Sequence, residues 1–197
     1  MAETPARAVD SRTLRTVAAI EAAVRAALRE IPLDDLTIAE VCRLADIKRP
    51  SFYTHFDSIP ELVAHMLTAE INNVLPIPGV EEVAAEQIEP LILDNFAVAL
   101  ELIARDRELY RAAFTSSSSG VLRDVLDRAI GMRVRNIITI WQDRGLVGDV
   151  DVAVAIPFVT GGIIRAIEAW AFDDATDATD RARAIRDLMP GWWPTAS

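Results

Sequence analysis

The sequence predicts an all-α protein, on three observations. The 197 residues are 51% hydrophobic, include only 8 Gly and 10 Pro, and are dominated by residues with high helix propensity. Apolar residues recur at spacings of three and four, the period of a helix with one buried face. Capping residues, prolines and glycines mark where successive helices begin and end. We therefore expect about nine helices: an N-terminal three-helix helix-turn-helix domain, joined by a connecting helix to a larger C-terminal helical bundle.

The first helix is expected over residues 11–30. Residues 1–10 have no periodicity and include Pro5, which is typical of a loose terminal arm. Ser11 is a suitable N-cap. Pro32 ends the helix because its ring and missing N–H do not fit a helix interior.

Two short helices with a tight corner between them are expected next. Thr37 and Glu40 have the spacing of a capping box at the start of the first. Pro50 lies in the first turn of the second, where its missing N–H costs nothing. Phe52 and Phe56 lie four apart and point inward, while small polar and basic side chains face outward. A short helix of this kind suits the major groove of DNA.

A connecting helix follows, and it ends at the clearest domain boundary. Ser58 and Glu61 form a second capping box at its start. The Pro-Ile-Pro-Gly run of residues 76–79 is a strong breaker. The sequence therefore predicts a helix-turn-helix domain over residues 1–75 and a second domain over residues 76–197.

The second domain is expected to contain five helices. Pro90 predicts a break or new start in the first, and Pro157 a kink in the fourth. Gly145 lies in a C-cap position, and the last helix begins at Thr176 or Thr179. The first four are expected over residues 80–104, 106–114, 121–144 and 149–172.

Charge argues against a generic nucleic-acid binder. The chain has 20 Lys and Arg against 30 Asp and Glu, and residues 1–67 have eight basic against ten acidic side chains. Because phosphate neutralisation supplies most non-specific affinity, any DNA affinity must come from a local patch. The candidates for this patch are Arg12, Arg15, Arg43, Lys48, Arg49 and His55.

The composition also indicates a soluble cytoplasmic protein. The polar N-terminus has no apolar segment resembling a signal peptide. Residues 147–172 come closest to a membrane span, but charged residues interrupt them, so we expect no membrane partner. Cys42 is the single cysteine, which fits a reducing compartment, and we expect it to be a buried apolar residue.

An enzyme would need a convergent set of acid, base or nucleophile residues. With two histidines and one cysteine, no such set is visible, and we expect no catalytic residue and no cofactor. Glu61 and His65 stand four apart, as metal ligands on a helix do, but a third ligand is lacking, so we expect a surface pair and no metal.

A set of residues between Thr37 and Leu62 follows a known pattern with its spacing kept without a gap. The set is Thr37, Ile38, Ala39, Ala45, Ile47, Tyr53, Thr54, His55, Phe56 and Leu62. In these residues the N-terminal region resembles the TetR family of transcriptional regulators, whereas the rest of the chain matches only in helix count and in a hydrophobic penultimate helix. Three positions depart from the family pattern: Asp46 replaces the turn glycine, Lys48 the capping serine and Ile59 a phosphate-contacting lysine.

The resemblance implies a dimer that binds a near-palindromic double-stranded operator through its recognition helices. Arg49, Pro50, Ser51, Thr54 and His55 would face the major groove. Phosphates would be held by Thr37, Lys48 and Tyr53. We expect modest non-specific affinity, because the domain is not basic and the phosphate-contacting lysine is absent.

The resemblance also implies a homodimer interface on the last two helices and an apolar pocket for a small-molecule effector. The expected interface residues are Gly161, Gly162, Ile164, Glu168, Ile185 and Leu188. The expected pocket residues are Phe96, Leu100, Ile103, Tyr110, Phe114, Ile137, Trp141 and Phe158, with Glu101 or Arg165 as a polar group that orients the ligand. Trp192 and Trp193 are expected to pack on the last helices.

These inferences favour a ligand-responsive repressor that releases its operator when an apolar effector binds. Two alternatives stay open. The two-helix unit can be an ordinary corner in a helical protein. The chain can also be a small-molecule-binding or protein-interaction dimer of the same fold with weak or lost DNA binding.

Overall fold

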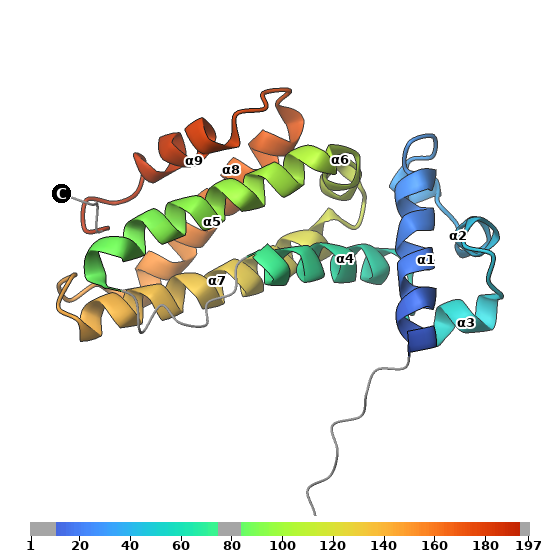
Figure 1. The fold of residues 1–197 in the computed structure, drawn as a ribbon, viewed down its shortest axis with the longest axis horizontal. Coiled ribbons are helices and arrows are strands. Elements are labelled where there is room, and N and C mark those ends of the chain that lie inside the picture. The colour runs from blue at the N-terminus through green and yellow to red at the C-terminus, as the bar shows by residue number, and fades with distance from the viewer. Residues whose placement is uncertain (1–10, 75–83, 194–197) are drawn as a thin grey trace, which may run out of the picture. The chain divides into compact units, whose positions relative to one another are not determined.

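A computed structural model describes residues 11–74 and 84–193 (Figure 1). Within these residues the chain forms nine α-helices and one 3₁₀ turn, with no strand, so the all-α prediction is confirmed. The predictions for residues 1–10 and 76–79 lie outside the described ranges. The helices are α1 (Ser11–Ala27), α2 (Ile38–Leu44), α3 (Arg49–Tyr53), α4 (Ile59–Val74), α5 (Ala85–Arg105), α6 (Arg107–Thr115), α7 (Ser119–Asp143), α8 (Val152–Phe172) and α9 (Ala178–Arg186).

The chain divides into two compact units, Met1–Val63 and Ala64–Ser197. The division falls within α4, which belongs to both units. In the first unit α1 packs on α2, and α2 packs on α3. Its core is formed by fully buried side chains of these helices and the start of α4, namely Ile20, Val24, Val41, Phe52 and Leu62.

In the second unit α5 lies alongside α9, and α8 packs against α5, α6 and α7 (Figure 1). Trp170 of α8 is fully buried, and its indole N–H donates to the carbonyl of Leu100 at 2.8 Å. The guanidinium groups of Arg107 and Arg181 each lie 5.1 Å from the centre of the Trp170 ring. These contacts join α5, α6, α8 and α9 around one indole.

Several helix boundaries differ from the sequence prediction, and α8 begins at Val152, three residues later than expected. The first helix ends at Ala27, three residues earlier than expected. Pro90 lies inside a continuous α5, because a proline in the second turn removes one backbone hydrogen bond and leaves the later ones in place. The N-cap of α9 is Asp177 rather than Thr176 or Thr179, and its carboxylate accepts from the Asp180 N–H at 2.9 Å.

The two predicted capping boxes are only partly formed. Thr37 accepts from the Glu40 N–H at 3.2 Å, but the Glu40 carboxylate binds Arg43 at 2.6 Å instead of returning to the cap. At α4 the Ser58 hydroxyl accepts from the Glu61 N–H at 3.2 Å, and the Glu61 carboxylate accepts from the Asp57 N–H at 2.6 Å rather than from the N–H of Ser58 itself. An arginine one turn away therefore competes for the glutamate of the first box.

Length and composition alone would allow α8 to cross a membrane, although we expected no segment to qualify. Only Arg165 and Glu168 interrupt its apolar sequence. A single helix of this kind is weak evidence for a membrane span, and α8 packs against three other helices, although only 28% of its most apolar window is buried.

The corner between α2 and α3 is a Schellman turn closed by Asp46. The Ile47 N–H donates to the Cys42 carbonyl at 3.0 Å, and the Asp46 N–H donates to the Arg43 carbonyl at 3.4 Å. Asp46 has a φ of 51°, in the left-handed region that glycine adopts without strain. Aspartate enters this region more readily than most residues, which explains how Asp46 can occupy the turn position where the sequence resemblance led us to expect a glycine.

Replacing Asp46 by glycine is expected to stabilise the helix-turn-helix unit. The substitution removes the steric cost of a left-handed aspartate, part of which is offset by the greater freedom of glycine in the unfolded chain, leaving a net gain of roughly 0.5 kcal/mol. Thermal unfolding followed by circular dichroism should show a midpoint higher by about 1–2 °C. Asp57→Gly, in an exposed turn without a positive φ, should lower the midpoint. An Asp46→Gly midpoint at or below that of the natural protein contradicts this account.

Candidate functional sites

The first candidate site is the outer surface of α3. Phe52 and Phe56 are buried, with ring centres 6.0 Å apart, and they hold α3 against the core as the sequence predicts. Ser51 and His55 are half-buried. The remaining residues expected to contact DNA are exposed: Thr37, Lys48, Arg49, Pro50, Tyr53 and Thr54. The six therefore offer hydroxyl, ammonium, guanidinium and apolar groups to solvent.

The cationic part of this surface is small. Arg43 is paired with Glu40, which leaves the charges of Lys48 and Arg49 nearest to the start of α3. Lys48 is the N-cap of α3, and its side chain makes no capping hydrogen bond, in agreement with the loss of the usual serine. Ile59 is buried at the start of α4, so the position where the resemblance led us to expect a phosphate-contacting lysine contributes to the core.

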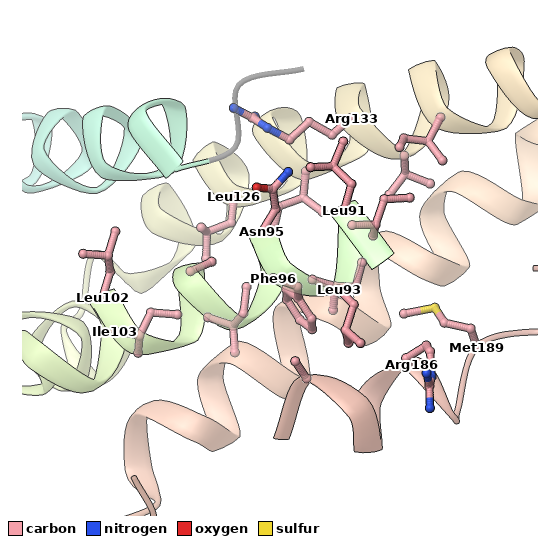
Figure 2. Close-up of a pocket in the computed structure, with 18 of the residues that line it drawn as sticks. Leu91, Leu93, Asn95, Phe96, Leu102, Ile103, Leu126, Arg133, Arg186 and Met189 are labelled. Carbon is pink, nitrogen blue, oxygen red and sulfur yellow. The ribbon is translucent and has the colours of Figure 1, made fainter. Parts of the chain in front are cut away.

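The second candidate site is a cavity of about 160 Å³ inside the second unit (Figure 2). Its lining is almost entirely apolar and comes from α5, α6, α7, α8 and α9, with Glu70 from α4. Four of the eight side chains expected around a pocket line it: Phe96, Ile103, Tyr110 and Ile137. Met189 and Trp193 close the cavity from the segment after α9.

The other four expected residues do not line the cavity. Leu100 is fully buried in the core, and Phe114 is buried with the guanidinium of Arg123 lying 5.8 Å from its ring centre. Trp141 is fully buried against Trp193, with ring centres 4.6 Å apart. Phe158 is 68% exposed on α8. Aromatic spacing on a helix does not distinguish these environments.

The polar residues of the cavity differ from those expected. Glu101 pairs with Arg105 at 3.5 Å and Arg165 pairs with Glu168, and neither lines the cavity. Instead, the Tyr110 hydroxyl donates to Glu70 at 2.9 Å. The remaining polar lining residues are Glu89, Asn95, Arg133 and Arg186.

The charged residues of this lining are held by partners from the chain itself. Arg186 pairs with Glu89 at 3.2 Å. Arg133 donates to Asn72 at 3.1 Å and to the Ala129 carbonyl at 2.7 Å, and burial lowers the pKa of its guanidinium. The sequence holds a signal for Arg133, because it lies among Ile130, Val134 and Ile137 at helical spacing.

The third candidate site is an apolar face of α8. Val154 is 63% exposed, Phe158 68% and Phe172 47%, although α8 is the most hydrophobic helix. Gly162, Arg165 and Ala169 continue the same exposed face at helical spacing.

The residues expected at a dimer interface are divided between this surface and the core. Gly161 and Gly162 lie on or beside the exposed α8 face, and Leu188 is 84% exposed after α9. Ile164 and Ile185 are buried in the chain's own core. Glu168 is paired with Arg123 at 2.9 Å and with Arg165.

The side chains that could bind a metal or act as a strong nucleophile include the acids, two histidines and a single cysteine. Within the described residues, no group of three or more His, Cys, Asp or Glu side chains converges as a metal site would. Cys42 is buried, as expected, and desolvation raises the pKa of its thiol. A raised pKa keeps the sulfur in its unreactive protonated form.

No protein-family model matches the sequence, and no curated protein matches it. Solved structures do resemble its fold. The dihydroxyacetone kinase operon activator DhaS aligns with a TM-score of 0.64 and 11% identity, over 88% of this chain and 93% of that one. RolR in complex with resorcinol aligns with a TM-score of 0.55 and 21% identity, over 92% and 90%.

A protein from Shewanella sp. PV-4, described as a TetR-family transcription regulator, aligns with a TM-score of 0.52 and 14% identity, over 88% of this chain and 97% of that one. At such identities the similarity concerns the fold. The chain has a TetR-like fold, as the resemblance of its N-terminal region predicts.

Proposed function

We propose that this protein is a transcriptional regulator that binds a near-palindromic operator as a homodimer and releases it when a small, mainly apolar effector binds. The observation that carries the proposal is the combination of two features in one chain. One is a helix-turn-helix unit with six exposed candidate DNA contacts, five of them on α3 or its caps, and the other is an apolar cavity in a separate unit. The TetR-like fold of the solved relatives supports the same reading.

In this proposal α3 reads the major groove. Arg49 reaches the O6 and N7 atoms of a guanine, and Pro50 or Thr54 contacts a thymine methyl group. Thr37, Lys48 and Tyr53 bind phosphates and set the position of α3 without reading sequence. Ser51 and His55, which are half-buried, complete the groove-facing surface.

One such unit reads only a few base pairs, so specificity requires two. The exposed α8 face supplies a surface for association between two copies. Val154, Phe158 and Phe172 would be buried there, and the two glycines of the face allow close helix packing. Association would also explain why the most apolar helix leaves large hydrophobic side chains in water.

Two hydrogen bonds connect the lining of the cavity to α4: Tyr110 donates to Glu70, and Arg133 donates to Asn72. Tyr110 lines the cavity and donates to Glu70 of α4, so a ligand that moves the tyrosine changes the support of that helix. Because α4 continues into the DNA-binding unit, we propose that the ligand favours a state in which both recognition helices no longer fit their grooves together.

Binding to the DNA that flanks the protein's own gene tests the proposal. Fluorescence anisotropy at several salt concentrations should show tighter binding to that DNA than to a scrambled duplex of the same length. The effector, added at saturation, should lower the affinity for the operator. Equal affinity for both duplexes would refute the regulator and favour a ligand-binding or protein-interaction dimer, a reading that the buried Ile59 and the acidic balance also favour.

The direction of regulation is a separate result. The activator DhaS has a similar fold, so this fold alone does not imply repression. Transcription from the flanking promoter in vitro should fall when the protein is added and recover with effector. A rise on adding the protein would make it an activator while leaving DNA binding intact.

A further inference from the structure

We infer that the cavity selects a neutral, single-ring ligand that carries a hydroxyl group, and that the Asn95 carboxamide is the side chain that recognises this hydroxyl. This inference rests on the proposed function, because it assigns the ligand of the proposed effector cavity. It names the chemistry of that ligand and one specificity-determining residue.

Size is the first argument. The cavity measures about 160 Å³. An apolar cavity of about 150 Å³ is sufficient for benzene. Aliphatic side chains and Phe96 line most of the wall, so a ligand that fills the space is mainly hydrocarbon. A single ring satisfies both the volume and the lining.

Charge is the second argument. Each charged residue of the lining has a partner supplied by the chain: Glu70 has the Tyr110 hydroxyl, Glu89 has Arg186, and Arg133 has Asn72. Only Glu89 and Arg186 form an ion pair, but an ionised ligand that bound any of these charged groups would have to compete with the partner that already holds it, which is costly in an apolar site. The lining therefore favours a neutral ligand.

The third argument is the state of Asn95. Figure 2 shows its side chain projecting from α5 toward α7, near Leu126. Within the part of the chain that the structure describes, this carboxamide has no hydrogen-bond partner, unlike the charged residues of the lining. A carboxamide offers both a donor and an acceptor, and a hydroxyl group can satisfy both at once. A hydrocarbon ring in the cavity would leave the carboxamide donor and acceptor without a hydrogen-bond partner from the ligand.

Direct binding of three one-ring probes tests the inference without DNA. Phenol, toluene and benzoate differ in one substituent, and calorimetry can measure each with the full-length protein. The affinity for phenol relative to toluene should fall about fivefold to tenfold in Asn95→Leu, which keeps the approximate volume of the side chain but removes its hydrogen bonds. Benzoate should bind most weakly to the natural protein.

The matched control is Asn136→Leu, the same change at an exposed position of α7 that does not line the cavity. It should leave the phenol-to-toluene ratio unchanged. Toluene also reports on folding, because Asn95→Leu should bind toluene at least as well as the natural protein does.

Three outcomes overturn the inference: a ratio that Asn95→Leu does not change, benzoate as the tightest ligand, or no binding of any probe. None of them bears on operator binding. The proposed regulator fails separately, in the comparison of operator with scrambled DNA.

Discussion

Replacing Arg49 by alanine is expected to lower operator affinity by about 100-fold or more while changing affinity for scrambled DNA only a few-fold. A bidentate arginine–guanine contact contributes about 1–3 kcal/mol of discrimination, and a dimer loses it twice. Arg49 is exposed at the first position of α3, so its loss should not disturb the core. Anisotropy titrations of both duplexes at fixed salt measure the two affinities.

Lys48→Ala is the matched control, one residue earlier on the same surface. A phosphate contact carries no sequence information, so this variant should weaken binding to both duplexes by the same factor. The slope of log affinity against log salt concentration should become shallower by about one per subunit. If Arg49→Ala weakened operator and scrambled DNA by the same factor, Arg49 would bind phosphate, and base recognition would have to come from other residues of α3.

Phe158→Glu is expected to convert the proposed dimer into a monomer and, as a result, to abolish tight operator binding. In the single chain this ring is 68% exposed, so the substitution should leave the fold intact. In a dimer that buries the α8 face, each subunit would instead place an unpaired carboxylate in an apolar contact, at a cost of several kcal/mol. Analytical ultracentrifugation should show a dissociation constant of the dimer that is at least about 100-fold higher than in the natural protein.

Val98→Glu provides the control, because Val98 is a comparably exposed apolar residue on α5. It should leave the sedimentation behaviour unchanged. Circular dichroism of both variants should match the natural protein. A Phe158→Glu protein that remains a dimer with unaltered affinity would show that the subunits associate through another surface.

The helix-turn-helix was predictable because its signals are local. Capping at Thr37, the left-handed turn at Asp46 and the inward pair Phe52 and Phe56 all lie within about twenty residues, and the structure contains each of them. Local chemistry of this kind specifies backbone geometry directly. It did not predict the partner of Glu40, because a nearby arginine competes with the helix end for the carboxylate.

The cavity was predictable only in part because five helices and one residue of α4 form it. Phe96 and Trp141 have the same apolar character, but only the first borders empty space, and the difference depends on how α5, α7 and the chain end at Trp193 pack. Asn95 lies among apolar residues at helical spacing, and a polar side chain in such a position is a sequence signal for a residue that lines a cavity. Phe158 faces solvent because the stripe on α8 is wider than one chain can cover.

The burial of Ile59 limits how this protein can diverge. A single substitution to lysine would add a cation at the position where the sequence resemblance led us to expect one, but it would also place a charged side chain in a position that is only 7% exposed. Stronger DNA binding is therefore more accessible through exposed positions that do not yet carry a positive charge, or through an earlier change that opens the packing around residue 59. The order in which mutations occur would then decide which operators descendants of this protein can bind.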